Sequence, residues 1–213
     1  MRIDLKDFFP SIKRVDVHRV FKNIGYSSNV SGLLAALTTL TEGLPQGAPT
    51  SPALSNIIFS HHDVDILDFA RKNQLFYTRY ADDLVFSGDV KPRDILAFLQ
   101  NAFSRTEFSI NPKKTRVMRR GARQIVNGIV VNDTLKAPRD TRRWIRQQVY
   151  YLEKRGLDAH LAFIDVTNSN YFGYLLGKIS FCLSCDSNDR QMQAAKRAVL
   201  AIRRNLADTL YES

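Results

Sequence analysis

Three aspartates stand in segments whose apolar neighbours predict short β-strands. Asp4 lies in the run Arg-Ile-Asp-Leu, and Asp82 and Asp83 follow Ala81 at a predicted hairpin tip. If these strands are neighbours, the carboxylates converge, and two such charges roughly 4 Å apart repel by about 4 kcal/mol at an effective dielectric near 20. A divalent cation relieves that repulsion, and Mg²⁺ favours one or two carboxylates together with substrate phosphates. The pattern indicates metal-assisted phosphoryl transfer, with the ordinary turn chemistry of Asp-Asp as the alternative.

The loop over residues 44–52 is a second candidate feature. Its sequence is Leu-Pro-Gln-Gly-Ala-Pro-Thr-Ser-Pro. Gln46 offers amide donors and an acceptor, the small residues after it leave room for a ligand, and the prolines lower the entropy lost on ordering. The alternative is a plain connection in which Ser51 caps a helix that begins at Pro52.

The elements that must position these residues follow from hydrophobic periodicity and from Gly and Pro breaks. We expect a strand at 2–5, helices at 16–24, 30–40 and 52–73, a hairpin of strands 75–80 and 84–87, and a helix at 92–104. Further strands are expected at 108–110, 116–118 and 124–131, then a basic helix at 138–155 and helices near 170–183 and 187–209. Asp7 is expected to face away from Asp4, because side chains at odd offsets alternate across a strand.

Composition excludes several classes of protein. The 213 residues hold two cysteines, too few for a disulfide-rich scaffold, and no apolar run approaches the roughly 18 residues of a membrane span. We therefore expect a cytoplasmic protein with no membrane partner. The net charge of +10 lies entirely in residues 111–213, and residues 113–146 hold 11 basic against two acidic residues. This asymmetry favours a polyanion such as nucleic acid, with a solvated basic face as the alternative.

Five segments, in order along the chain, resemble the palm motifs of reverse transcriptases. The first three are Arg-Ile-Asp4-Leu-Lys-Asp-Phe-Phe9-Pro-Ser, Leu-Pro-Gln46-Gly-Ala-Pro-Thr-Ser-Pro-Ala-Leu-Ser-Asn56 and Tyr-Thr-Arg-Tyr80-Ala-Asp82-Asp83-Leu-Val-Phe-Ser. The later two lie at 110–115 and 124–132. The Ala-Pro-Thr-Ser-Pro loop and the Gly-Ile-Val-Val-Asn run are most similar to bacterial retron-type enzymes.

The resemblance implies an α+β fold in two parts. Residues 1–135 would form a right-hand polymerase palm, an antiparallel, ferredoxin-like sheet with packed helices, and residues 136–213 a basic helical thumb. Met1 lies three residues before Asp4, so the fingers region that precedes this aspartate in the family would be absent. We therefore expect little or no polymerisation by the 213 residues alone.

The resemblance also implies roles around the metal and the nucleotide. Asp4 and Asp82 would be the main ligands of two Mg²⁺ ions, for which Mn²⁺ could substitute, with Asp83 nearby and less direct. The backbone of Leu5 and Lys6 would meet the metal-bound triphosphate.

The nucleotide and the nucleic acid would meet further residues. Phe9 would lie under the sugar and exclude a 2′-hydroxyl, Gln46 would touch the incoming nucleotide, and Lys114 would assist the leaving pyrophosphate. Residues expected at the primer and template are Tyr80, Gly128, Arg139, Arg142, Arg143 and Arg146.

The implied activity is RNA-directed DNA polymerisation. The partners would be an RNA template, a DNA or RNA primer, dNTPs and, for a retron, a cognate structured non-coding RNA, with phage defence as one biological setting. The alternative is an intron maturase-like protein or a non-catalytic RNA-binding fragment, which the basic stretch alone would also suit.

Overall fold

The structure is a computed structural model that describes residues 1–41, 43–119, 121–165 and 170–211. By their contacts the residues divide into two compact units, Met1–Met118 and Arg119–Ser213. Each unit has its own cluster of buried apolar side chains.

The first unit is built on a four-stranded antiparallel sheet. Its elements are β1 Arg2–Lys6, α1 Phe8–Ser11, α2 Arg14–Ile24, α3 Ser28–Thr38, α4 Ser51–Lys72, β2 Phe76–Tyr80, β3 Asp83–Ser87, α5 Pro92–Phe103 and β4 Ser109–Arg116. The strand order is β2-β3-β1-β4, and each neighbouring pair is antiparallel. A first strand inserted between the third and the fourth is the ferredoxin-like arrangement. The predicted α+β class and sheet type are confirmed.

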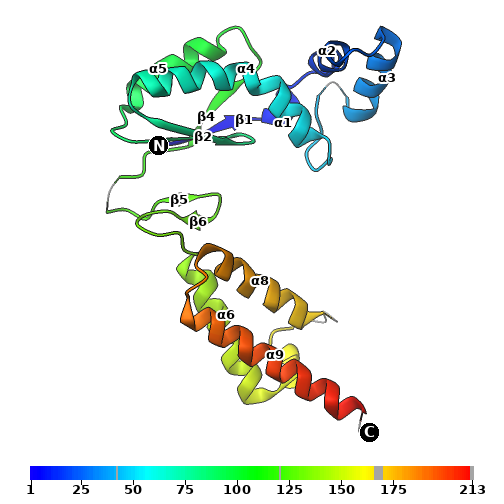
Figure 1. Cartoon of the computed structure of the whole chain (residues 1–213), viewed down its shortest axis with the longest axis vertical. Helices are drawn as coiled ribbons and strands as arrows, with labels where there is room; N and C mark the ends of the chain where they lie inside the picture. Colours follow the sequence, from blue (N-terminus) through cyan, green and yellow to red (C-terminus); the bar gives the residue numbers. More distant parts are fainter. Residues whose placement is uncertain (42, 120, 166–169, 212–213) are drawn as a thin grey trace. The chain divides into compact units, whose positions relative to one another are not determined.

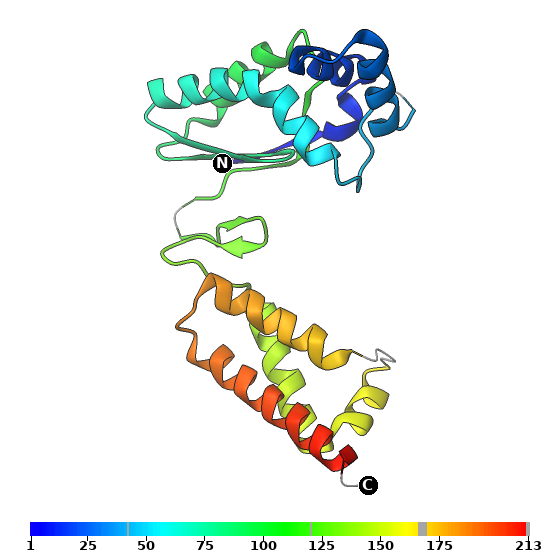
Figure 2. The same ribbon diagram turned by 45° about the vertical axis from the view of Figure 1, so that its right-hand side comes forward.

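Helices cover one face of this sheet. Both views show α4 and α5 over the strands (Figures 1 and 2), and the rings of Phe69 and Phe98 from these two helices stack with centroids 4.2 Å apart. Ile3 and Leu5 of β1 are buried in the same cluster as the helix residues. Because strand residues alternate between faces, the residues between and beside them, Asp4 included, face away from the helices. The packing of β1 thus decides where the first candidate carboxylate points.

The predicted helices begin and end close to their expected positions, the short helices α1 and α7 were not predicted, and the strand after α5 does not match its prediction. Residues 108–110 and 116–118 were expected as two strands, and the chain instead forms one irregular strand, β4. Its pairing with β1 shifts register between Asp4↔Asn111 and Arg2↔Arg116, so that the intervening residues of β4 bulge out of the ladder. Pro112 lies in this bulge and has no N–H to donate to a neighbouring strand.

The second unit is mainly helical. Its elements are β5 Ile125–Val126, β6 Ile129–Val130, α6 Arg139–Arg155, α7 Leu157–Phe163, α8 Tyr171–Cys185 and α9 Arg190–Tyr211. Ile145 of α6, Leu175 and Ile179 of α8 and Val199 of α9 are fully buried together. Along the described stretches of the chain, no helix is both long and apolar enough to cross a lipid bilayer.

The segment predicted as one strand over 124–131 is a hairpin of two short strands. Asn127 and Gly128 connect them with φ angles of 48° and 79°. Left-handed backbone at both central residues suits a type I′ turn, for which Asn-Gly is the strongest short sequence signal. The single-strand prediction was wrong because the apolar residues on both sides of Asn-Gly were taken as one run.

The contact boundary also falls earlier than the predicted one at residue 135. Val130 and Lys136 exchange backbone hydrogen bonds of 2.9 and 3.0 Å, which join the hairpin to the segment that enters α6. The hairpin is a separate two-stranded sheet, not part of the four-stranded one. Residues 119–135 therefore belong by contact with the helical unit.

Candidate active site

Asp4 is held at the centre of the sheet. In the antiparallel register it lies opposite Asp83 of β3 on one side and Asn111 of β4 on the other. Its side chain is 5% exposed. Asn111 Nδ2 donates to Asp4 Oδ1 at 3.1 Å, and Lys114 Nζ donates to Asp4 Oδ2 at 3.3 Å. The carboxylate is thus buried, oriented and paired with one cation.

The bulge in β4 is what brings Lys114 to Asp4. A regular ladder would place Lys114 one residue from the partner of Arg2, not beside Asp4. Asn111 stabilises the irregular backbone, because its Oδ1 accepts from Lys113 N–H at 3.2 Å while its carbonyl accepts from Thr115 Oγ1 at 2.9 Å. The Lys114 side chain is 65% exposed, so its ammonium can leave Asp4 for another anion.

Asp83 is the third aspartate of the predicted site. It lies directly across from Asp4, yet its carboxylate is bound by the Arg2 guanidinium through contacts of 2.9 and 2.6 Å. Like charges opposite one another in a sheet are destabilising, and a cation two residues away on the same face relieves this. The bond to Asp83 also raises the pKa of Arg2. Asp83 therefore lies beside Asp4 and near Asp82, with its own carboxylate paired to Arg2, and its role as a metal ligand stays a prediction.

Asp82 occupies the turn between β2 and β3. Tyr80 pairs with Asp83, so the turn has two residues, Ala81 and Asp82. The Asp82 carbonyl accepts from Leu5 N–H at 2.9 Å, which docks the turn against β1. Burial, followed by the charges of Asp4 and Asp83, raises the pKa of the Asp82 carboxyl. Its ionised form therefore needs a cation more than an exposed aspartate does.

A cavity of about 400 Å³ gathers most of the predicted site residues. Those that line it are Asp4, Leu5, Lys6, Asp7, Phe8, Phe9, Gln46, Asp82, Asn111 and Lys114. Every predicted metal or nucleotide residue except Asp83 is present. Three lining residues, Asp7, Phe8 and Asn111, were not predicted for the site. Asn111 lies within a quoted motif, and its register opposite Asp4 is not visible in the sequence.

The prediction that Asp7 faces away from Asp4 rested on strand alternation, and Asp7 lies beyond the strand. β1 ends at Lys6, and Asp7 has a left-handed backbone with φ 46° as the chain enters α1. Strand alternation does not extend past that turn, and Asp7 is one of the residues that line the same cavity.

The loop that carries Gln46 is anchored by a hydrogen bond from the helix that follows it. Ser51 begins α4, and its Oγ donates to the Pro45 carbonyl at 2.7 Å. Leu44, just before, is fully buried, and its N–H donates to the carbonyls of Phe9 and Ile12. Gln46 itself is exposed, so the loop is anchored at both ends while its amide remains available. The alternative of Ser51 as an N-cap is wrong: Thr50 holds that position, and Ser51 bonds to the loop.

The predicted primer and template residues lie outside the cavity. Tyr80 is 70% exposed on β2, and Gly128 lies in the turn of the β5–β6 hairpin. Arg139, Arg143 and Arg146 are exposed on α6 at a spacing that places them on one helix face. Arg142 differs from them, because its guanidinium donates to Asp189 at 2.9 Å and is 27% exposed.

The donor chemistry fits a magnesium ion that is completed by substrate. Among the described residues, no three His, Cys, Asp or Glu side chains gather closely enough to hold an ion by themselves. Asp4 and Asp82 instead supply two oxygen donors at one cavity, and Mg²⁺ is commonly bound by one or two carboxylates together with substrate phosphates. Burial, then the charges of Asp4 and Asp83, raises the pKa of Asp82, and a bound cation would favour its ionised form.

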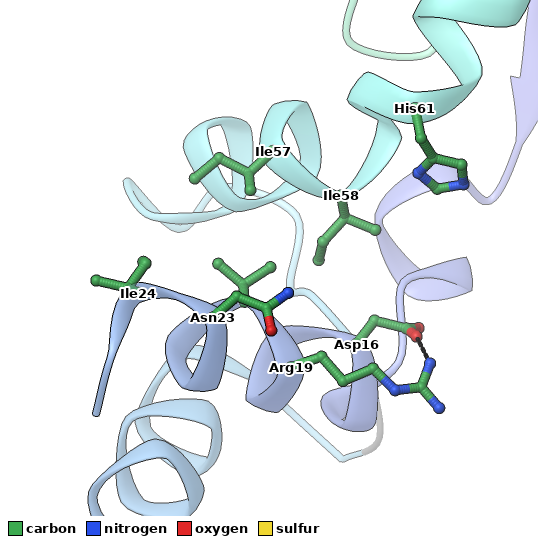
Figure 3. A pocket seen from close by; sticks show the side chains of 8 residues that line it. Asp16, Arg19, Asn23, Ile24, Ile57, Ile58 and His61 are labelled. Carbon is green, nitrogen blue, oxygen red and sulfur yellow. Dashed lines mark hydrogen bonds and ion pairs between the residues drawn. The ribbon is translucent and has the colours of Figure 1, made fainter. Parts of the chain in front are cut away.

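A second cavity of about 420 Å³ lies in the same unit between α2 and α4 (Figure 3). Aliphatic side chains such as Ile24, Ile57 and Ile58 form much of its wall, and the polar side chains near its edge include the ion pair of Asp16 and Arg19. It contains none of the predicted site residues, and this distinguishes it from the cavity at the end of β1.

Comparison with known proteins agrees with the geometry of the first cavity. Residues 1–175 match the family model described as reverse transcriptase (RNA-dependent DNA polymerase). The chain belongs to the reverse transcriptase family. The retron Mx65 reverse transcriptase of Myxococcus xanthus is 37% identical over 186 residues, which cover 78% of this chain and 44% of the relative. The retron Ec86 reverse transcriptase of Escherichia coli is 34% identical over 197 residues, 90% of this chain and 57% of the relative.

These relatives support the retron-type assignment. A third, the retron Mx162 reverse transcriptase of Myxococcus xanthus, is 34% identical over 190 residues, 72% of this chain and 39% of its own length. This reverse transcriptase chain spans about half the length of the curated relatives that it matches.

Proposed function

We propose that the cavity at the end of β1 is the nucleotidyl-transfer centre of an RNA-directed DNA polymerase. In the proposed reaction, a primer 3′-oxygen forms a bond to the α-phosphorus of a dNTP, the bond to the β-phosphate breaks, and pyrophosphate leaves. The observation that carries the proposal is the placement of Asp4 and Asp82 in one cavity with Gln46 and Lys114. Family membership supports it.

The metal would be held by Asp4 and Asp82, with the Leu5 backbone beside them. Two bound Mg²⁺ ions, or Mn²⁺ in their place, would supply charge stabilisation for the attacking and leaving oxygens. Asp83 would act less directly, since Arg2 already neutralises it.

The chain's own groups would bind and orient the nucleotide. The ammonium of Lys114 would exchange its contact with Asp4 for an oxygen of the triphosphate, and would then stabilise the charge on the departing pyrophosphate. Phe9 would lie against the sugar and exclude a 2′-hydroxyl, while the Gln46 amide would hold the nucleotide at the other wall. Catalysis of this kind rests on positioning and charge stabilisation.

The second unit would hold the nucleic acid. The exposed guanidinium groups of Arg139, Arg143 and Arg146 would contact the phosphates of the RNA template and its DNA or RNA primer, with Tyr80 and Gly128 nearer the primer end. A cognate structured non-coding RNA, which the resemblance to retron-type enzymes implies, would be a further partner.

The test is Mg²⁺-dependent primer extension on an RNA template. Because the 213 residues span about half of the curated relatives, the assay uses the chain alone and the chain fused behind the fingers region of a retron relative. We expect Asp82→Asn to lower extension by the fusion at least about 100-fold, the usual scale for losing one catalytic electrostatic contact. The exposed Asp89 provides the control variant, Asp89→Asn. Extension that survives Asp82→Asn at the level of Asp89→Asn would refute the proposal.

A binding measurement separates loss of activity from loss of the site. Mn²⁺ with dATP should broaden the amide NMR signals of Leu5 and Lys6 in the 213-residue chain, because these residues line the cavity. Asp82→Asn should abolish the broadening, and Asp89→Asn should leave it intact.

A further inference from the structure

Arg79 is a buried cation with an unusually complete set of partners. Its side chain is 8% exposed. Nε and NH2 donate to the two oxygens of Asp63 at 2.8 and 2.6 Å, and NH1 donates to Asn56 Oδ1 at 3.0 Å. Its guanidinium carbon lies 4.6 Å from the centre of the Phe59 ring. Such a fork is specific to arginine, since a lysine ammonium cannot reach the same acceptors together.

All three side chains that surround Arg79 come from α4. Asn56, Phe59 and Asp63 are spaced by three and four residues and therefore lie on one helix face. Tyr77, the neighbour of Arg79 on the same face of β2, also donates to Asp63, at 2.8 Å. The helix thus presents a preformed cradle for one side chain of the sheet.

The remaining contact of Arg79 reaches the turn that carries Asp82. NH1 donates to the Ala81 carbonyl at 3.1 Å. Ala81 has φ 50°, a left-handed conformation that disfavours a residue with a Cβ and that glycine usually supplies in such a turn. A strained turn persists only where its surroundings hold it. In this turn, the Ala81 carbonyl accepts a hydrogen bond from Arg79, and the Asp82 carbonyl accepts one from Leu5 N–H.

We propose that Arg79 is a positioning residue that clamps the Ala81–Asp82 turn to α4 and so sets the place of the Asp82 carboxylate relative to Asp4. The same helix begins at Ser51, which anchors the Gln46 loop through Pro45. One helix therefore supports two walls of the cavity, the loop at its N-terminus and the turn through Arg79. As a statement about catalysis, the proposal rests on the proposed nucleotidyl transfer.

Hydrogen exchange in the 213-residue chain tests the clamp without any activity. The Leu5 amide reports docking of the turn, because its acceptor is the Asp82 carbonyl. We expect Arg79→Lys to speed exchange of this amide by about tenfold relative to the core amides of Ile66 and Leu99, the effect of losing one charge-assisted hydrogen bond. The matched control is Arg71→Lys, which alters an exposed ion pair with Asp68 on the same helix and should leave the ratio unchanged.

A glycine at position 81 should make the turn independent of Arg79. Ala81→Gly removes the Cβ that disfavours the left-handed conformation of the turn. In that background, Arg79→Lys should change the exchange rate of the Leu5 amide, relative to the Ile66 and Leu99 amides (the Leu5 ratio), by less than threefold. Equal effects of Arg79→Lys with and without Ala81→Gly would overturn the proposal. So would a rise in Leu5 exchange that merely matches the rise at Ile66 and Leu99, since Arg79 would then act only on global stability.

A milder variant covers the case in which Arg79→Lys fails to fold. Asn56 is exposed, and Asn56→Ala removes one acceptor of the fork while leaving the Asp63 pair in place. We expect a two- to threefold rise in the Leu5 ratio, about the net effect of a neutral hydrogen bond. Asn101→Ala, an exposed change on α5, is its control. An unchanged ratio in Asn56→Ala would contradict the clamp.

Primer extension connects the clamp to catalysis. If the fused enzyme extends primers, Arg79→Lys should lower kcat about tenfold and leave KM for dNTP within threefold, because the nucleotide site persists while the carboxylate is misplaced. Ala81→Gly should recover most of the lost kcat. An equal loss through KM alone would refute a positioning role. Absence of extension by the unsubstituted enzyme would count against the proposed function, whereas the exchange result would still decide the clamp.

Discussion

The two units of this chain place their polar groups in opposite ways. In the first unit, charged side chains are held in pairs on or beside the sheet: Lys114 with Asp4, Arg2 with Asp83 and Arg79 with Asp63. In the second unit, the fully buried network is neutral, with Tyr171 hydroxyl donating to Gln148 Oε1 at 3.1 Å and lying 2.9 Å from His160 Nε2, while Arg142 and Asp189 form a partly buried ion pair. Most of that unit's cations lie on exposed side chains.

This difference follows from what each unit would have to do. Transfer chemistry requires charges in fixed positions, and bidentate or buried pairs fix them. Holding a polyanion requires many cations and little fixed geometry, because most of that binding comes from neutralised phosphates. Residues 119–213 carry 16 basic and nine acidic residues, against 15 and 12 in residues 1–118. The second unit thus holds most of the excess positive charge.

Each unit also buries a histidine. His62 of α4 packs among aromatic rings, with centroids 5.2 Å from Phe59 and 5.5 Å from Phe103 and Phe108. His160 is fully buried and shares a hydrogen bond with Tyr171. Because the Tyr171 proton goes to Gln148, the His160 Nε2 must carry the hydrogen of that bond. Burial lowers the pKa of both imidazoles.

The largest effect is expected from breaking the neutral network of the second unit. Tyr171→Phe leaves the polar atoms of Gln148 and His160 without this partner, and we expect the free energy of unfolding to fall by about 1–3 kcal/mol. Urea denaturation followed by circular dichroism measures the change. Tyr150→Phe, at a 52% exposed residue of the same unit, should stay within about 0.5 kcal/mol. Equal effects of the two variants would show that the network does not stabilise this core.

The pH dependence of the free energy of unfolding tests the effect of the buried His62 in the first unit. Burial among the aromatic rings, then the neighbouring charge of His61, lowers the pKa of His62 from 6.5 to about 4. Between these values the unfolded chain binds a proton that the folded chain does not, so stability should fall as pH drops from about 6.5 to 4, by on the order of 1–2 kcal/mol. Urea midpoints at pH 7 and pH 4.5 test this.

The control for the titration is His62→Leu, which should flatten the pH dependence in this window. His18→Gln on α2, where the histidine is only partly buried, should not. If His62→Leu keeps the full slope, other groups are responsible for it.

The smallest effects are expected from single exposed arginines of α6. Arg139→Gln and Arg143→Gln should each weaken RNA binding a few-fold and reduce the slope of log K against log salt by about 0.7–0.9. Arg142→Gln should instead mainly lower stability, because its partner Asp189 also accepts from the N–H groups of Gln191 and Met192 at the start of α9. Filter binding across a salt series distinguishes the two behaviours. Identical salt slopes for all three variants would show that Arg142 does not differ from Arg139 and Arg143 in its contact with RNA phosphates.

Much of the site could be predicted because its signals are local. Asp82 at a hairpin tip follows from two β-prone runs separated by a few residues, and the start of α4 follows from Pro52 after a Gly/Pro-rich loop. The end of α2 at Gly25, which has φ 114°, is equally local. Such features depend only on residues that are close along the chain, so they can be recognised in the sequence without knowledge of the fold. The Asn127-Gly128 turn is also a local signal, but the prediction treated the residues on both sides of it as a single strand.

The remaining features join residues that are distant along the chain. Arg2 and Asp83 are 81 positions apart, and Asp4 and Lys114 are 110 apart. Which of these residues meet depends on the register of β1 against β3 and β4, and the β4 bulge shifts that register. For the same reason Asn111 and the cradle of Arg79 were not predicted as parts of the site.

The sequence alone thus determined the order of the elements, the family and the aspartates of the candidate site, because residue types and short spacings encode them. Only the tertiary structure decided where those aspartates lie and what they contact. Asp4 and Asp82 face one cavity while Arg2 binds Asp83. The physical reason is that a charged side chain takes the nearest oppositely charged partner, and the pairing of strands sets which partner is nearest.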